Sequence, residues 1–220
     1  MMSTPSFEWK AQTWAAMGFA DPVFESQEAF RTILHAMAYP GRRTSLKAPP
    51  TVPHGINPAA WVILLTLGDS SVRLWMDLPR NHEACRAAQQ FCHVSMVPDP
   101  ESADFILVTQ PSQLKPPYRF CIGTELEPER GASIIMQVSS MSISEPSSAE
   151  SVFMLSGPGI PETSKVTLQG CPFHFWEWRL GLEHVYPRGV DLFLTEGNSL
   201  VCIPRSVCLT PAKGVSCTLR

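Results

Sequence analysis

Four charged residues near the carboxyl end of the chain are candidates for a polar site: Arg179, Arg188, Asp191 and Arg205. Asp191 lies in an otherwise apolar strand. A carboxylate left unpaired in a core is costly, so it must reach a donor, take up a proton or face water. The arginines could bind phosphate or phosphonate oxygens, because a guanidinium group donates two parallel hydrogen bonds to such oxygens. The alternative, which we favour, is an ion pair that fixes this corner of the fold.

The elements that must position this cluster are two strands, predicted at 190–195 and 199–203. Gly197-Asn198 lies between them and indicates a hairpin turn. A three-residue loop would place Asp191 opposite Arg205, whereas a two-residue loop would place it opposite Pro204, on the other face from Arg205. The sequence leaves both registers open.

A second candidate is the segment Gly157-Pro158-Gly159, whose backbone amides could hold a phosphate group. It lacks both the GxxxxGK[ST] and the GxGxxG patterns, so we favour a plain turn after a strand. His174 and Glu177 could form an acid and base pair on one helical turn. The aromatic residues around them instead indicate a core-packing helix over 173–182 with a polar edge.

Other catalytic constellations have no sequence support, and we predict neither a catalytic residue, nor a metal, nor a cofactor. Seven cysteines occur without a CxxC pair, six histidines occur without an HExxH pattern, and the serines lack a GxSxG turn. A pyridoxal phosphate enzyme needs a lysine positioned for a Schiff base. Lys165, which we expect in a loop beside a glycine turn, has nothing around it that resembles such a site.

Composition narrows the class of protein. The formal net charge is −3 and the isoelectric point is about 6.1, which argues against a nucleic acid partner. We find neither a stretch that could span a membrane nor a signal peptide, so we expect no membrane partner and a cytoplasmic location. A chain of 220 residues with 44% hydrophobic residues can form one domain over 1–220.

The remaining pattern predicts a layered α/β domain, a mixed β-sheet flanked by helices. Helices are expected from Ser26 to a stop at Pro40-Gly41, from Asn57 as cap to Gly68, and over 81–91. Strands are expected at 72–77, 105–109, 133–138 and 152–156, with a loop over 139–151. We predict a docking arm over 1–20, anchored by aromatic residues that include Trp9 and Trp14, and a flexible tail over 208–220.

Six tryptophans and eleven phenylalanines predict aromatic surface for a second chain, and hence a homodimer.

Several blocks, in order, resemble the PhnH subunits of the carbon-phosphorus lyase system. They are Gly18-Phe19-Ala20-Asp21-Pro22-Val23, Phe30-Arg31, Ala36-Met37-Ala38-Tyr39-Pro40-Gly41, Gly157-Pro158-Gly159-Ile160, Tyr186-Pro187-Arg188-Gly189-Val190-Asp191-Leu192 and Ile203-Pro204-Arg205. Each block alone is weak, but the ordered set is specific.

The resemblance implies a fold similar to that of pyridoxal-phosphate-dependent transferases but without the cofactor. It implies a homodimer in isolation and assembly with the PhnG, PhnI and PhnJ subunits. The complex would form ribose 1-methylphosphonate 5-triphosphate from a nucleoside triphosphate and an alkylphosphonate, with no catalytic residue in this subunit. The alternative is an autonomous phosphonate- or nucleotide-binding transferase that uses an arginine-lined pocket.

Overall fold

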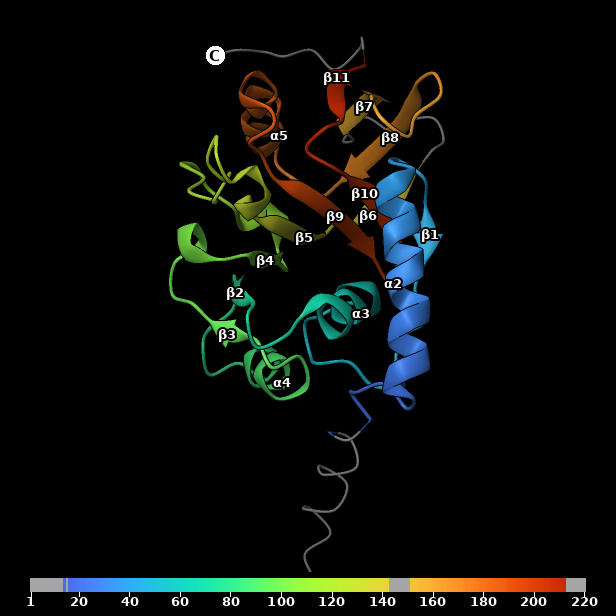
Figure 1. The fold of residues 1–220 in the computed structure, drawn as a ribbon, viewed down its shortest axis with the longest axis vertical. Coiled ribbons are helices and arrows are strands. Elements are labelled where there is room, and N and C mark those ends of the chain that lie inside the picture. Colours follow the sequence, from blue (N-terminus) through green and yellow to red (C-terminus); the bar gives the residue numbers. More distant parts are fainter. Residues whose placement is uncertain (1–13, 15, 143–150, 213–220) are drawn as a thin grey trace, which may run out of the picture.

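The centre of the molecule is a mixed sheet of short apolar strands. In the computed structural model, which describes residues 14, 16–142 and 151–212, its order is β1-β10-β9-β5-β4-β2-β3 (Figure 1). Strands β3, β2, β4, β5 and β9 run parallel, and β10 and β1 are antiparallel to their neighbours. The inner strands are buried on both faces, as parallel strands usually are. The bounds are β1 Thr44–Ser45, β2 Arg73–Met76, β3 Ser95–Met96, β4 Phe105–Val108, β5 Ser133–Gln137, β9 Asp191–Glu196 and β10 Ser199–Ile203.

Three helices cover one face of this sheet: α2 (Pro22–Ala38), α3 (Pro58–Leu67) and α4 (Glu83–Phe91) (Figure 1). The α3 helix begins as predicted, because Pro58 occupies the first turn and the Asn57 side chain accepts a hydrogen bond from the Ala60 amide at 2.8 Å. It ends at Gly68, and its first turns are buried all round.

The start of α2 differs from the prediction. Asp21 is the cap, accepting a hydrogen bond from the Phe24 amide at 3.2 Å, and Pro22 is the first residue of the helix. Ser26 lies inside the first turns and donates to the Pro22 carbonyl instead. The predicted end is confirmed, because Gly41 follows Pro40 with φ +77°, in the left-handed region that glycine tolerates best.

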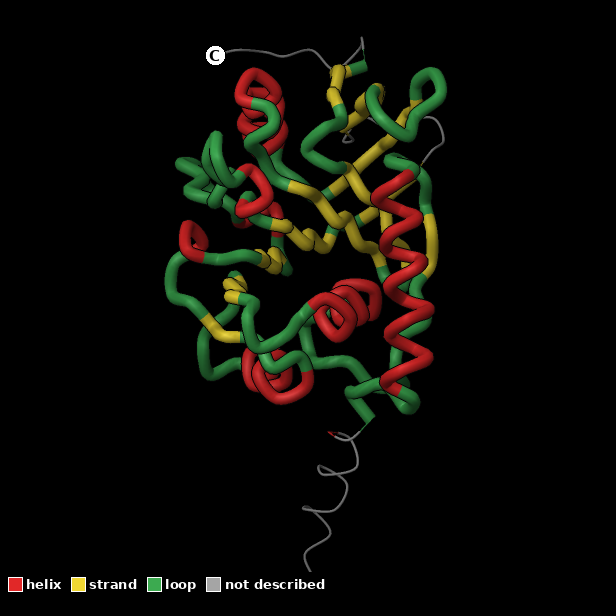
Figure 2. The backbone as a smooth tube through the Cα atoms, viewed as in Figure 1, coloured by secondary structure: helices red, strands yellow, loops and turns green. Residues whose placement is uncertain are grey.

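The other face carries α5 (Phe173–Gly181) and a second, antiparallel sheet of order β11-β7-β8-β6. Its strands are β6 Ser140–Ser142, β7 Ser151–Ser156, β8 Ser164–Gln169 and β11 Cys208–Pro211. Short 3-10 turns complete the chain: η1 Pro100–Ser102, η2 Pro111–Gln113, η3 Pro128–Arg130 and η4 Leu182–Val185. Figure 2 shows that the connection from β4 to β5 consists of loops and such turns.

This second sheet corrects three predictions. Residues 140–142 form β6 rather than loop, Lys165 lies within β8 rather than in a loop, and residues 208–211 form β11 rather than the start of a tail. The physical reason is non-local pairing: β11 joins β7 with Leu209 opposite Leu155, and β6 joins β8. The part of the predicted loop at 143–150 and the part of the predicted tail at 213–220 lie outside the described residues.

The described end of the predicted arm packs on its own chain. The Met17 carbonyl accepts a hydrogen bond from the Trp61 indole at 2.7 Å, and the Trp14 and Phe91 rings stack with centroids 6.2 Å apart. Trp9 lies outside the described residues. Within the described ranges, no helix combines the length and the apolar character needed to cross a bilayer.

Candidate functional site

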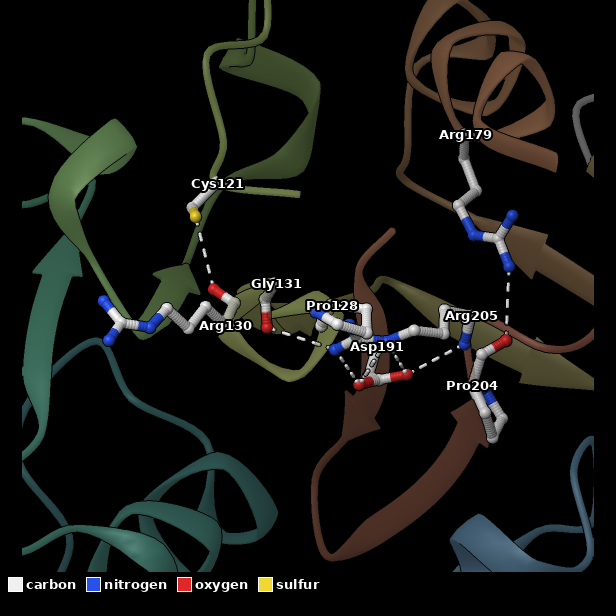
Figure 3. A network of polar contacts seen from close by, with 8 residues as sticks. All are labelled: Cys121, Pro128, Arg130, Gly131, Arg179, Asp191, Pro204 and Arg205. Atoms are coloured by element: carbon white, nitrogen blue, oxygen red, sulfur yellow. Dashed lines mark hydrogen bonds and ion pairs between the residues drawn. The ribbon is translucent and has the colours of Figure 1, made fainter. Parts of the chain in front are cut away.

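Asp191 and Arg205 form a close ion pair at the amino end of β9 (Figure 3). The Arg205 Nη2 atom lies 2.6 Å from Asp191 Oδ2, and its Nε atom lies 3.1 Å from the same oxygen. The Arg205 backbone amide also donates to Asp191 Oδ1 at 2.8 Å. Both side chains are largely buried, so the pair is shielded from water and salt.

The hairpin that brings the two residues together has the two-residue loop. Glu196 pairs with Ser199 and Leu192 with Ile203, so the same register continued would place Pro204 opposite Asp191. The expectation that this register would put Arg205 on the other face was wrong. The chain leaves the ladder after Ile203 and turns, with the Val207 amide bonded to the Pro204 carbonyl, and this turn points Arg205 back at Asp191.

Arg205 also reaches the loop before β5. Its Nη1 donates to the Pro128 carbonyl and its Nη2 to the Gly131 carbonyl at 3.1 Å (Figure 3). These bonds and those to Asp191 occupy most of the donors of the guanidinium group. The cluster also lies at the amino end of the parallel strands, whereas ligands of open α/β sheets bind at the carboxyl ends. The geometry therefore supports the ion pair that fixes this corner.

Arg179 holds the same turn from the other side. It extends from α5, is 1% exposed, and its Nη2 donates to the Pro204 carbonyl at 3.2 Å and the Val207 carbonyl at 3.1 Å. Its Nε has no hydrogen-bond partner. Burial lowers the pKa of this guanidinium from its ordinary value, with nearby carboxylates such as Glu183 acting in the opposite direction. Arg179 thus contributes to the corner through backbone carbonyls rather than through Asp191.

Arg188 lies apart from the other three. It borders an open hollow together with the loop 123–127. Among the described residues, its side chain makes no hydrogen bond or ion pair. The structure therefore joins Asp191 to Arg205, connects Arg179 to them through a shared turn, and leaves Arg188 separate.

The glycine loop is a tightly packed turn. Gly157 and Gly159 have φ of +137° and +80°. A Cβ atom on Gly159 would lie 2.0 Å from the Ala38 carbonyl oxygen, because the loop rests on the end of α2. A Cβ atom on Gly157 would lie 3.0 Å from the Ser206 carbonyl oxygen, so backbone packing accounts for both glycines and supports the plain turn.

The aromatic helix is core-packing with a polar edge, as predicted: Phe175 and Trp176 are buried, while His174 and Glu177 are exposed. Sequence reasoning missed the partner of His174. Its Nδ1 atom is hydrogen-bonded to the hydroxyl of Tyr118, which lies in the loop between β4 and β5.

A polar cluster at the carboxyl ends of the parallel strands was also missed. Asp77 follows β2 and accepts hydrogen bonds from the Thr109 amide and hydroxyl and from the Gln110 amide, all between 2.8 and 2.9 Å. Nearby, Asn57 bonds to Gln137 and Thr195. The available signal was a polar residue at or directly after the end of an apolar strand: Asp77 follows β2, Thr109 follows β4, and Gln137 ends β5. In the part of the chain that the structure describes, no three His, Cys, Asp or Glu side chains are placed to hold a metal ion.

Comparison with known proteins agrees with the ordered sequence blocks. The family described as "Bacterial phosphonate metabolism protein (PhnH)" matches residues 17–210. A relative from Rhizobium meliloti (strain 1021), named "Alpha-D-ribose 1-methylphosphonate 5-triphosphate synthase subunit PhnH", is 28% identical over 86% of this chain and 92% of its own length. A second, "Putative C-P lyase subunit protein HtxG" from Stutzerimonas stutzeri, is 29% identical over 82% of this chain and 83% of its own. The chain therefore belongs to the PhnH family of bacterial phosphonate metabolism proteins.

Proposed function

We propose that this chain is a noncatalytic subunit of a carbon-phosphorus lyase core complex, required for phosphonate catabolism. The complex forms ribose 1-methylphosphonate 5-triphosphate from a nucleoside triphosphate and an alkylphosphonate in the cytoplasm. The observation that carries the proposal is the family match over residues 17–210, joined by two relatives whose names identify them as subunits. The internal bonds of Arg205 favour this role over an autonomous transferase with an arginine-lined pocket.

The partners follow from the same reasoning: PhnG, PhnI and PhnJ in the complex, and a second copy of this chain in isolation. The outer face of α2 is suited to such contacts. Val23, Phe30 and Leu34 recur at helical spacing, and Leu34 and Val23 are 56% and 74% exposed. Phe24 and Tyr39 extend this exposed face at its two ends. Large exposed apolar surface of this kind is typical of protein interfaces.

The opposite face of α2 attaches the helix to the rest of the molecule, so the outer face is not needed for folding. Ala29, Ile33 and Ala36 pack against the molecule, so α2 already has its place in the core without the outer residues. Figure 1 shows α2 along the outside of the molecule, beside α3 and β1.

We further propose that the fold is that of a pyridoxal-phosphate-dependent transferase without the cofactor.

Co-purification with neighbouring subunits tests the assembly. Tagged wild-type chain, produced with PhnG, PhnI and PhnJ, should retain all three, and the host lacking this chain should fail to grow on methylphosphonate. The chain alone should not turn over nucleoside triphosphate with methylphosphonate. Sustained turnover by the pure chain, or growth of the deletion strain, would refute the subunit role.

Sedimentation at micromolar concentration tests the α2 surface. The isolated chain should be a dimer that survives about 0.5 M salt, because apolar burial rather than exposed charge holds it together. Phe30→Glu with Leu34→Glu should yield a folded monomer. Leu126→Glu is the matched control, since Leu126 is 94% exposed on another part of the surface and should leave the dimer intact. A dimer unchanged by the α2 substitutions would move the interface elsewhere.

A further inference from the structure

A cavity of about 430 Å³ lies on the sheet face opposite α3 and α4. Trp75 reaches it from β2, Tyr118 and Phe120 from the loop between β4 and β5, and Leu114 and Pro117 complete an apolar wall. This size is within the range of small-molecule sites, which are mostly apolar and aromatic with a few polar groups. The cavity is distinct from the Asp191 and Arg205 corner, since the two share no residue.

The aromatic wall is held in place from behind. The Tyr118 ring stacks on Phe120 with centroids 5.8 Å apart and meets Phe175 edge-on at 5.6 Å. Its hydroxyl is bonded to His174 on α5. Burial raises the pKa of Tyr118 to about 12, so the phenol stays neutral at physiological pH. The wall is therefore a rigid, uncharged surface.

The rim of the cavity carries two cations and two carboxylates: Lys115, Arg119, Asp99 and Glu101. Among the described residues, none of these four side chains forms an ion pair or a hydrogen bond. Some charged side chains elsewhere in the molecule do have partners, as Arg73 does with Asp104 and Arg43 with Glu196. Two cations and two anions around one hollow, all without partners, are free to contact a ligand.

We propose that this cavity binds a phosphorylated ribonucleoside. A planar base matches the aromatic wall, because every base can stack on aromatic side chains. Phosphate oxygens match Lys115 and Arg119, and ribose hydroxyls donate to the carboxylates of Asp99 and Glu101, as acidic residues accept from ribose in dinucleotide sites. A free phosphate would face the two carboxylates as well as the cations, and a bare nucleobase would leave the cations unused. A ligand that combines a base, a ribose and a phosphate would contact the aromatic wall, the two carboxylates and the two cations.

Calorimetric titration of the isolated chain with adenosine 5′-triphosphate in a metal-free buffer tests the proposal. We expect saturable binding, and substitutions Lys115→Gln and Arg119→Gln should each weaken it about tenfold, the size of one lost charge-assisted hydrogen bond. Asp99→Asn with Glu101→Gln should remove the preference for the ribonucleotide over its 2′,3′-dideoxy analogue. Adenosine lacks phosphate and should bind through its base and ribose alone. Trp75→Leu should therefore weaken the binding of adenosine by the same factor as the binding of the nucleotide.

Arg31→Gln is the matched control, because Arg31 is an exposed cation on α2, away from the cavity. It should bind as the wild type does. No saturable binding up to millimolar nucleotide would overturn the proposal, as would equal binding of inorganic triphosphate, which would reveal only general attraction of anions. Melting curves of each variant separate lost binding from lost folding. Since the titration uses the isolated chain, its failure would leave the co-purification result untouched.

Discussion

Charged side chains gather in two regions: the corner formed by Asp191 and Arg205, and the rim of the aromatic cavity. In the first region the charges are buried and paired, and in the second they are exposed and, among the described residues, unpaired. At the corner, the carboxylate of Asp191 and the guanidinium group of Arg205 are largely buried and bonded to each other, and the guanidinium group also donates to two backbone carbonyls. At the rim, Lys115 and Asp99 are exposed and make no side-chain bond within the described residues.

This difference separates charges that stabilise the fold from charges available for binding. A buried pair is costly to break, because removing one member leaves the other desolvated. Exposed unpaired charges contribute little to folding. Substitutions in the two regions should therefore differ in their effect on the free energy of unfolding.

The largest effect is expected at the corner. Asp191→Ala leaves the Arg205 guanidinium with carbonyl acceptors alone and should destabilise the chain by about 2 to 4 kcal/mol. Chemical denaturation measures this. Glu127→Ala is the control, because its ion pair with Arg130 is exposed, and it should cost less than about 1 kcal/mol. Equal losses in the two variants would remove the distinction between the regions.

A slightly smaller effect is expected at the glycine loop beside the same corner. Gly159→Ala should destabilise by about 1 to 3 kcal/mol, because φ is +80° and the new methyl group meets the Ala38 carbonyl. Gly181→Ala, at a helical position where nothing lies within 4 Å of the added Cβ, should be neutral or mildly stabilising. Thermal melting distinguishes them. A neutral Gly159→Ala would show that the loop can move away and leave room for a ligand.

The Arg73 and Asp104 pair is intermediate, since it is bonded but partly exposed. The hydrogen bond from Arg73 lowers the pKa of Asp104 from its usual value. The folded state therefore binds this proton less readily than the unfolded state, so the stabilisation is present above the unfolded pKa and is lost as pH falls through the folded pKa. Asp104→Asn should be less stable than the wild type at neutral pH, with the difference shrinking in acid. A difference independent of pH would exclude the ion pair as its cause.

The smallest effect is expected at the rim. Lys115→Gln, Arg119→Gln, Asp99→Asn and Glu101→Gln should each change the free energy of unfolding by no more than about 0.5 kcal/mol, as surface substitutions usually do. Urea denaturation without nucleotide measures this. A cost above about 1 kcal/mol at any of them would mean that the residue supports the fold.

The elements whose signals are local could be predicted from the sequence. Asn57, Pro58 and Gly68 define α3 because capping and turn chemistry act within a few residues. Apolar runs predicted β2, β4, β5, β9 and β10 of the large sheet but not the two-residue strands β1 and β3, and the ordered blocks predicted the family that residues 17–210 confirm. The candidate charges were found too, because a lone Asp191 in an apolar strand is conspicuous.

Which of these residues come into contact depends on the tertiary fold. Strands β6 and β11 were missed because segments this short carry little local signal and are strands only by pairing with β8 and β7. Arg205 reaches Asp191 through the turn after Ile203, which hairpin register alone did not reveal. The cavity joins Trp75, Asp99 and Tyr118 from three segments, and no local pattern specifies such a meeting, because side-chain proximity across elements depends on how the whole sheet and its loops pack.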